Sequence, residues 1–119
     1  MAAKEQEIRV YNTKDGKRPF DKWFDGLRDR NAQQRIDARL ARVQLGNFGD
    51  SKTVGEGVLE LRIDYGPGYR VYFGRDGDQV VLLLMGGDKR TQSKDIATAK
   101  EYWADYKARK QEETNGTHK

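Results

Sequence analysis

A chain of 119 residues is long enough for one domain with a single modest core. Hydrophobic and charged residues each make up 35% of the sequence, and the net charge of +4 favours an acidic partner such as nucleic acid or an acidic protein. The absence of cysteine excludes disulfides and thiol chemistry. No apolar run approaches the roughly 20 residues of a membrane helix, and the beginning of the sequence lacks the apolar core of a signal peptide. We therefore expect a soluble, cytoplasmic protein that does not enter a membrane.

The beginning of the sequence predicts a short strand followed by a helix. Glu7–Tyr11 alternates apolar with polar residues, which is typical of a strand. After a turn, Pro19 suits the first turn of a helix because its missing N–H costs nothing there. Four apolar residues then recur at the spacing i, i+3, i+4, i+7, namely Phe20, Trp23, Phe24 and Leu27. We interpret this stripe as a helix face that packs in the core rather than as a ligand site.

A second helix is predicted from Asn31, which can cap it together with Gln34, to Gly46, which suits a helix C-cap. Its thin apolar stripe consists of Ile36, Leu40 and Val43. Its other faces carry Arg35, Arg39 and Arg42. These arginines form either a solvated helix face or a basic ridge for RNA or an acidic partner. The following segment, Gly46–Gly57, is predicted to be a loop, in which Lys52 is a candidate phosphate contact.

The stretch Val58–Gly74 predicts a β-hairpin with one covered and one open face. It divides at Gly66–Gly68 into two runs that each alternate apolar and polar residues. The apolar set consists of Leu59, Leu61, Ile63, Tyr65, Tyr69, Val71 and Phe73. If this set faces the core, Arg62 and Arg70 project from the same outer face of neighbouring strands. Two guanidinium groups on one sheet face suit the binding of a phosphate.

The run Val80–Met85 is apolar without alternation, so it predicts a strand in the interior of the sheet that is covered on both faces. Gly86–Arg90 follows at the end of that strand. A last helix is expected next, capped by Thr91 or Ser93. Its apolar stripe consists of Ile96, Ala99, Trp103 and Tyr106.

The predicted elements form an α+β fold in the order strand, helix, helix, three strands, helix. Residues 1–109 are expected to form a single domain, because no internal repeat or linker interrupts them. Residues 110–119 are polar, and we expect them to form a frayed or disordered tail.

The catalytic sets that are commonest in enzymes are missing from the sequence. Its single histidine, His118, lies in the predicted tail, and no cysteine supplies a thiol or a metal ligand. The glycines that follow Val80–Met85 lack the Gly-Lys-Ser/Thr pattern of a P-loop. We therefore predict a site with neither a metal nor a cofactor.

The sequence offers a set of cations instead. These are Arg62, Arg70, Lys89 and Arg90, with Glu60, Tyr72 and Asp88 as neighbouring acidic or hydroxylic groups. Such a set can cleave RNA, because the 2′-hydroxyl supplies the nucleophile and arginines stabilise the developing charge. The proton transfers need a general base and a general acid, and a lysine among arginines can take either role. The alternative is that these cations form salt bridges with Glu60, Asp64 and Asp88.

Three segments of the sequence resemble a known family. They read PFDKWFDGLRDRNAQQRIDARLARVQLGNFGD, LELRIDYGPGYRVYF and LLLMGGDKRTQSKDIATAKEYWADYK. They resemble the RelE/ParE superfamily of toxins, specifically its HigB-like addiction-module killer branch, over about residues 7–109. The resemblance implies a RelE-like β-α-α-β-β-β-α fold. In that fold a mostly antiparallel four-stranded sheet packs on a helical hairpin, with a C-terminal helix.

The resemblance also implies roles for individual residues. Arg70, in Gly-Tyr-Arg, matches an arginine that stabilises the transition-state phosphate, and Arg62 falls where relatives have a basic residue near the scissile bond. Lys89 and Arg90 match a Lys-Arg pair after the last strand, whose arginine is implicated in catalysis. We expect these four residues to be catalytic. We expect RNA contacts from Glu60, Tyr72, Lys52, Arg39 and Arg42.

Two departures from the family pattern leave the general base and acid open. Glu60 stands where one branch has a lysine. Ile96 stands where that branch has a catalytic tyrosine, and no histidine replaces it as in some HigB toxins.

The leading functional prediction is the toxin of a bacterial type II toxin–antitoxin pair, an endoribonuclease that cuts mRNA in the ribosomal A site and so inhibits translation. One alternative is a non-enzymatic poison of DNA gyrase, as in ParE-like relatives. Another is an inactive member that only binds its antitoxin. The expected partners are a helix-turn-helix antitoxin, mRNA on the ribosome, and operator DNA only through the antitoxin.

Overall fold

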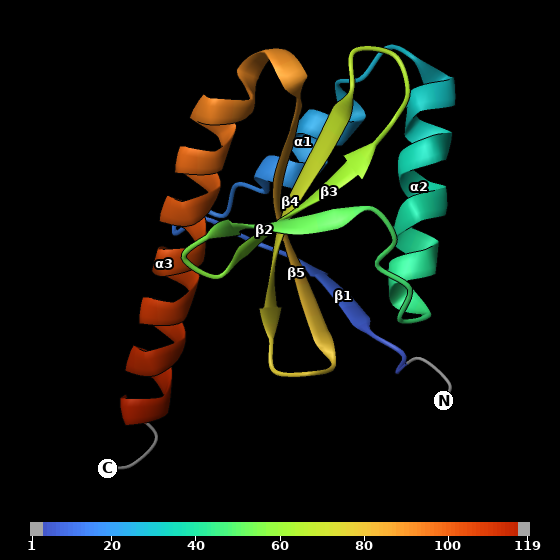
Figure 1. The fold of residues 1–119 in the computed structure, drawn as a ribbon. Coiled ribbons are helices and arrows are strands. Elements are labelled where there is room, and N and C mark those ends of the chain that lie inside the picture. Colours follow the sequence, from blue (N-terminus) through green and yellow to red (C-terminus); the bar gives the residue numbers. More distant parts are fainter. Residues whose placement is uncertain (1–3, 117–119) are drawn as a thin grey trace.

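The computed structural model describes residues 4–116, and these form five strands, three α-helices and one 3₁₀ turn (Figure 1). In chain order the elements are β1 (Glu7–Val10), α1 (Pro19–Asp25), α2 (Arg30–Gln44), β2 (Ser51–Gly55), β3 (Val58–Ile63), β4 (Tyr69–Asp76), β5 (Val80–Asp88), the 3₁₀ turn (Lys89–Thr91) and α3 (Gln92–Gly116).

The strands form one mixed sheet in the order β1-β5-β4-β3-β2. Strand β1 runs parallel to β5, and the other neighbouring pairs are antiparallel. The predicted α+β class is confirmed, but the expected four-stranded sheet is wrong because β2 adds a fifth strand. This strand lies within Gly46–Gly57, which the composition assigned to a loop. At a sheet edge, backbone pairing with a single neighbour is enough to form a strand, so no apolar alternation marks β2 in the sequence.

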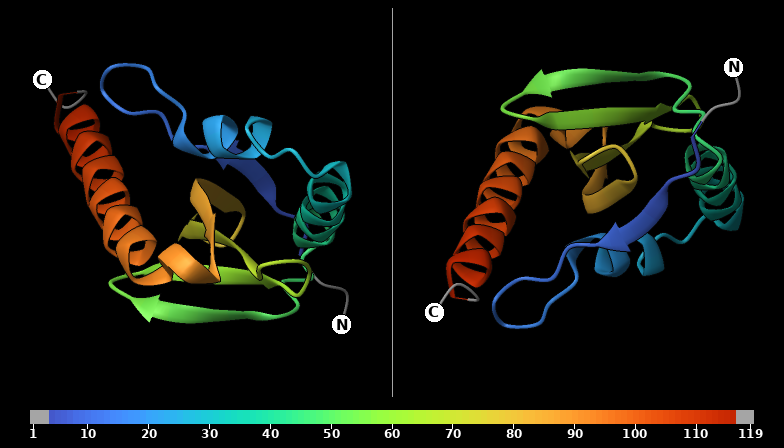
Figure 2. Two further views of the ribbon diagram at one scale, coloured as in Figure 1. Left: turned by 90° about the horizontal axis from the view of Figure 1, so that it is seen from above. Right: turned by 90° about the horizontal axis from the view of Figure 1, so that it is seen from below.

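Helices cover both faces of the sheet (Figure 2). Helices α1 and α2 pack on one face, where the core includes Phe20, Ile36, Val43, Leu61, Val71 and Phe73. Helix α3 packs on the other face, where the core includes Tyr11, Val58, Tyr72, Leu84, Ala99 and Trp103. Strand β5 lies between β1 and β4 and is buried on both sides, as predicted, since Val81 and Leu83 belong to the first cluster while Leu82 and Leu84 belong to the second.

The predicted hairpin is formed by β3 and β4, with Glu60 opposite Tyr72 and Arg62 opposite Arg70. Its second face is not open as expected, because α3 covers most of it. Glu60 and Tyr72 are therefore completely buried. Only the end of the hairpin that carries Arg62 and Arg70 remains accessible to a ligand.

The helix ends differ from the sequence-based expectation at three points. Helix α1 ends at Asp25, before Leu27 of the predicted stripe. Asp29 caps α2, accepting hydrogen bonds from the backbone N–H groups of Asn31 and Ala32, so Asn31 is not the cap. Helix α3 continues beyond Arg109 to Gly116, so the first part of the expected tail is helical, and His118 lies outside the described residues. Within residues 4–116 no helix is both long and apolar enough to cross a membrane.

Two glycines allow tryptophan rings to lie directly on the sheet. A Cβ added to Gly86 would lie 2.2 Å from the Trp23 ring, and one added to Gly74 would lie 2.4 Å from the Trp103 ring. A β-bulge between β4 and β5 shifts their register between Tyr72 and Phe73. Because a bulge reverses which side chains face which layer, it places Gly86 on the α1 side of the sheet, beneath Trp23.

Replacing Gly86 with alanine should lower the free energy of unfolding by about 1–3 kcal/mol, because the new methyl group overlaps the Trp23 ring. Urea unfolding of Gly86→Ala measures this loss. In a Trp23→Leu background the same substitution should cost less than half as much, since the ring that it collides with has gone. An equal cost in both backgrounds would show that the ring contact is not the cause.

Candidate functional site

A polar cleft of about 330 Å³ lies at the accessible end of the β3–β4 hairpin. We call it the cation cleft, and it is lined by Asp50, Arg62, Asp64, Gly66, Pro67, Gly68, Arg70 and Lys89. Arg62 and Arg70 are direct cross-strand partners. The backbone N–H of Lys89 donates to the carbonyl of Gly68 over 2.9 Å, which joins the hairpin turn to the end of β5. Three cations from three segments of the chain thus surround one hollow.

The carboxylate of Glu60 lies beneath the cleft and is completely buried. It accepts hydrogen bonds from Gln92 Nε2 over 2.7 Å, Tyr72 Oη over 3.1 Å and Arg62 Nε over 3.3 Å. Burial alone would raise the pKa of Glu60, but these hydrogen bonds and the charge of Arg70 outweigh it and hold the pKa below its usual value. Glu60 is therefore an anion at neutral pH that offsets the charge of the two arginines.

Arg70 is the more enclosed of the two arginines, with 11% of its side chain exposed against 36% for Arg62. Its Nε lies 3.8 Å from Oε1 of Glu60, and it is buried without a hydrogen-bond acceptor in residues 4–116. Its Nη1 donates to the carbonyl of Tyr69 over 3.1 Å. Both Nη atoms lie within 4 Å of the position that a Cβ would take on Gly68, so this glycine keeps the cleft wall open beside the guanidinium.

The structure separates the other predicted site residues from the cleft. Glu60 and Tyr72 are buried below it and cannot touch RNA directly, because α3 covers that face of the hairpin. Arg39 donates hydrogen bonds to the backbone carbonyls of Arg62, Phe48 and Asp50. These hydrogen bonds hold α2 against β3 and the segment before β2. Lys52 on β2 and Arg42 on α2 are exposed and do not line the cleft.

Arg90 also lies outside the cleft. Its side chain is 80% exposed and pairs with Asp88 over 3.0 Å. The hydrogen bond from Arg90 holds the pKa of Asp88 below its usual value. Of the four cations predicted to be catalytic, the structure thus brings together Arg62, Arg70 and Lys89.

Sequence reasoning missed Asp50 and Gln92 and gave Asp64 only a salt-bridge role. Asp50 stands in the segment predicted to be a loop, and Gln92 opens α3, so neither belongs to a pattern that marks a site. Only Asp64 carried a signal, because it shares the face of the extended chain that carries Glu60 and Arg62. Within residues 4–116 no group of three or more His, Cys, Asp or Glu side chains is arranged to hold a metal ion.

Residues 22–104 match the family model described as "Phage derived protein Gp49-like (DUF891)", which spans more than half of the chain and the whole cation cleft. The chain belongs to this Gp49-like family. Gp49-like proteins fall in the group of RelE-like toxins of addiction modules, whereas membership of the HigB branch stays a prediction. A protein of Haemophilus influenzae named only as uncharacterized is 53% identical over 81 residues, which cover 68% of this chain and 82% of that protein.

In this Gp49-like chain, Glu60→Gln should lower the free energy of unfolding by about 3 kcal/mol at pH 7, because it leaves Arg62 and Arg70 without their buried counter-charge. The folded-state pKa of Glu60 lies below the ordinary value of 4.5, so its contribution is complete above that pH and is lost as the pH falls through the folded-state pKa. The stability difference between wild type and variant should therefore shrink below about pH 4.5.

Urea unfolding between pH 7 and pH 3 measures this difference. Glu7→Gln is the matched control, because Glu7 forms an exposed pair with Arg9 and should change stability little at any pH. A gap between Glu60→Gln and wild type that stays constant over the whole range would contradict a charged Glu60.

Proposed function

We propose that this chain is the toxin of a toxin–antitoxin module and acts as a ribosome-dependent endoribonuclease of the HigB-like type. The observation that carries the proposal is the gathering of Arg62, Arg70 and Lys89 around one cleft, above the buried carboxylate of Glu60. Membership of a family of addiction-module toxins supports the toxin class. The RelE-like resemblance of the hairpin supports RNA as the substrate.

In the proposed reaction the 2′-oxygen of a ribose attacks the adjacent phosphorus, and the bond from phosphorus to the 5′-oxygen breaks. The products are a 2′,3′-cyclic phosphate and a free 5′-hydroxyl. Negative charge builds up on the phosphoryl oxygens in the transition state, and fixed cations stabilise it most when they need not reorganise. Arg70, held by Glu60 and by the carbonyl of Tyr69, is the cation best fixed for this task.

The proton transfers need separate groups. Glu60 is excluded as the base because it is buried and already accepts three hydrogen bonds. Asp50 and Asp64 are the carboxylates that line the cleft. Asp64 lies two residues after Arg62, so its side chain projects on the same side of the chain, and we assign it to accept the 2′-hydroxyl proton. The ammonium group of Lys89 is the proton donor that the cleft offers to the leaving 5′-oxygen.

Arg70→Ala should slow mRNA cleavage by about 10²–10³-fold, because it removes a preorganised donor to the transition state. The double variant Arg70→Ala/Lys89→Ala should show no detectable cleavage. Primer extension on translating ribosomes measures both. The control is Arg9→Ala on β1, which removes an exposed arginine two strands away from β4. Cleavage by the double variant at the wild-type rate would exclude these roles.

Asp64→Asn should slow cleavage by about 10²-fold or more while RNA binds at least as tightly, since the variant loses a proton acceptor and a negative charge together. Single-turnover cleavage and an RNA-binding titration separate the two effects. Asp64→Glu should retain part of the activity because it keeps a carboxylate, and Asp50→Asn is the matched control within the same cleft. A loss of binding with an unchanged single-turnover rate would assign Asp64 to substrate binding instead.

A gyrase poison is the second candidate, and one observation favours it: among the described residues, no tyrosine or histidine lines the cation cleft. A supercoiling assay with purified gyrase distinguishes the two. Inhibition of gyrase without mRNA cleavage would replace the ribonuclease proposal. If induction of the chain without its antitoxin leaves growth unchanged, the chain is instead an inactive member that only binds the antitoxin.

A further inference from the structure

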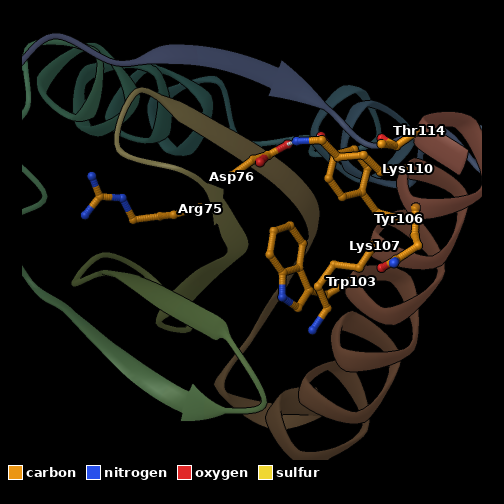
Figure 3. Close-up of a pocket in the computed structure, with 8 residues that line it drawn as sticks. Arg75, Asp76, Trp103, Tyr106, Lys107, Lys110 and Thr114 are labelled. Carbon is orange, nitrogen blue, oxygen red and sulfur yellow. Dashed lines mark hydrogen bonds and ion pairs between the residues drawn. The ribbon is translucent and has the colours of Figure 1, made fainter. Parts of the chain in front are cut away.

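A second hollow, of about 480 Å³, lies between α3 and the far end of β4 (Figure 3). We call it the aromatic hollow. Trp103, Tyr106, Lys107 and Lys110 enter it from α3, and Asp76 enters it from the end of β4. Its size lies within the range of binding pockets, which is about 300–1,000 Å³. Arg75 stands at its rim and points away from the rings, toward Phe48.

The floor of the hollow is aromatic. The rings of Trp103 and Tyr106 stack with their centroids 5.5 Å apart. The hydroxyl of Tyr106 donates to Asp76 over 2.6 Å, and burial together with this bond raises the pKa of Tyr106 to about 12, so it stays neutral. Trp103 belongs to the core beneath α3, so the half-buried Tyr106 is the ring that a bound partner can contact.

The rim of the hollow carries an excess of positive charge. Asp76 is neutralised by Lys110, whose hydrogen bond holds the pKa of Asp76 below its usual value. Lys107 lies over the Trp103 ring, 5.6 Å from its centroid, and pairs with no carboxylate within residues 4–116. The charge that remains over the aromatic floor is therefore positive, which favours an acidic occupant.

The end of the helix that forms one wall is largely exposed, although Arg109 donates to the carbonyl of Asn12 and lies over the ring of Tyr11. From Lys107 to Thr114 every residue of α3 is exposed except the half-buried Arg109. In Figure 1 these last turns and the β4–β5 turn spread apart. A helical stretch with no apolar face gains little stability from its own chain. It therefore offers a second surface along which a bound partner can lie.

We propose that the aromatic hollow binds an acidic segment of the antitoxin, which inserts one apolar side chain over Tyr106 and places a carboxylate beside Lys107. The inference rests on the toxin assignment for the existence of an antitoxin, and it is independent of ribonuclease activity. A protein segment fits better than RNA because Gly74, Tyr106 and Lys107 already contact the ring of Trp103, which leaves it no free face for a base to stack on.

The position of the hollow also fits a regulator rather than the substrate. Arg70 and Arg75 stand five positions apart on β4, which places the hollow about 16 Å along the strand from the cation cleft at ~3.3 Å per residue. A short segment confined to the hollow leaves the cation cleft uncovered. The two sites can therefore be tested separately by substitution.

The test compares two charge reversals on exposed lysines of the same helix, Lys107→Glu in the hollow and Lys94→Glu near the start of α3. The probe is the purified protein encoded by the neighbouring gene, and its affinity for the full chain is measured by titration calorimetry. Lys107→Glu should weaken binding at least tenfold, whereas Lys94→Glu should leave it within about twofold of wild type. Wild-type binding should weaken as the salt concentration rises.

Four outcomes would overturn the proposal. The first is that the neighbouring protein does not bind the wild-type chain. The second is that the Lys107→Glu variant binds it as tightly as wild type does. Alternatively, Lys107→Glu weakens binding to a short RNA, which would make the hollow a nucleic-acid contact. The last is that light scattering finds a wild-type dimer that the Lys107→Glu substitution dissociates, which would make the hollow a contact between two copies of the chain. None of these measurements requires RNA cleavage, so they stay informative whether or not the ribonuclease proposal holds.

Discussion

The buried carboxylate of Glu60 is the constraint on which the candidate site depends. A charge inside the protein is tolerated only when hydrogen bonds and an opposite charge replace its lost water. Glu60 meets this requirement with donors from three elements, Arg62 on β3, Tyr72 on β4 and Gln92 at the start of α3, and with Arg70 beside it. The same contacts that keep Glu60 charged fix the two arginines at the cleft. Stability and electrostatic preorganisation therefore have one origin here.

Strand β4 connects the two sites that we describe. At its start Arg70 faces the cation cleft, and at its end Asp76 anchors the aromatic hollow. Strands on both sides hold β4 in place, since it is the middle strand of the sheet. In our proposals α3 carries the surface for the antitoxin, and the β3–β4 turn carries the site for RNA.

Much of the fold followed from residue periodicity, while the composition of the site did not. Alternation along the hairpin correctly placed Arg62 and Arg70 on the same face of neighbouring strands, and the unbroken apolar run correctly placed β5 inside the sheet. Periodicity states which residues share a face but not what covers that face, so the burial of Glu60 and Tyr72 beneath α3 was not foreseen. Charge patterns likewise do not show which cations are already engaged. Arg39 binds backbone carbonyls and Arg90 binds Asp88, and both resembled ligand contacts in the sequence.

The two tryptophans lie on opposite faces of the sheet, one beneath each helical layer, and the sequence contains no others. Each indole is therefore an intrinsic fluorophore for a single interface, Trp23 for the packing of α1 and Trp103 for the packing of α3. A variant in which one tryptophan is replaced therefore reports, through the fluorescence of the other, on one helical layer alone. In a variant without Trp23, emission from Trp103 can thus follow events along α3 in real time.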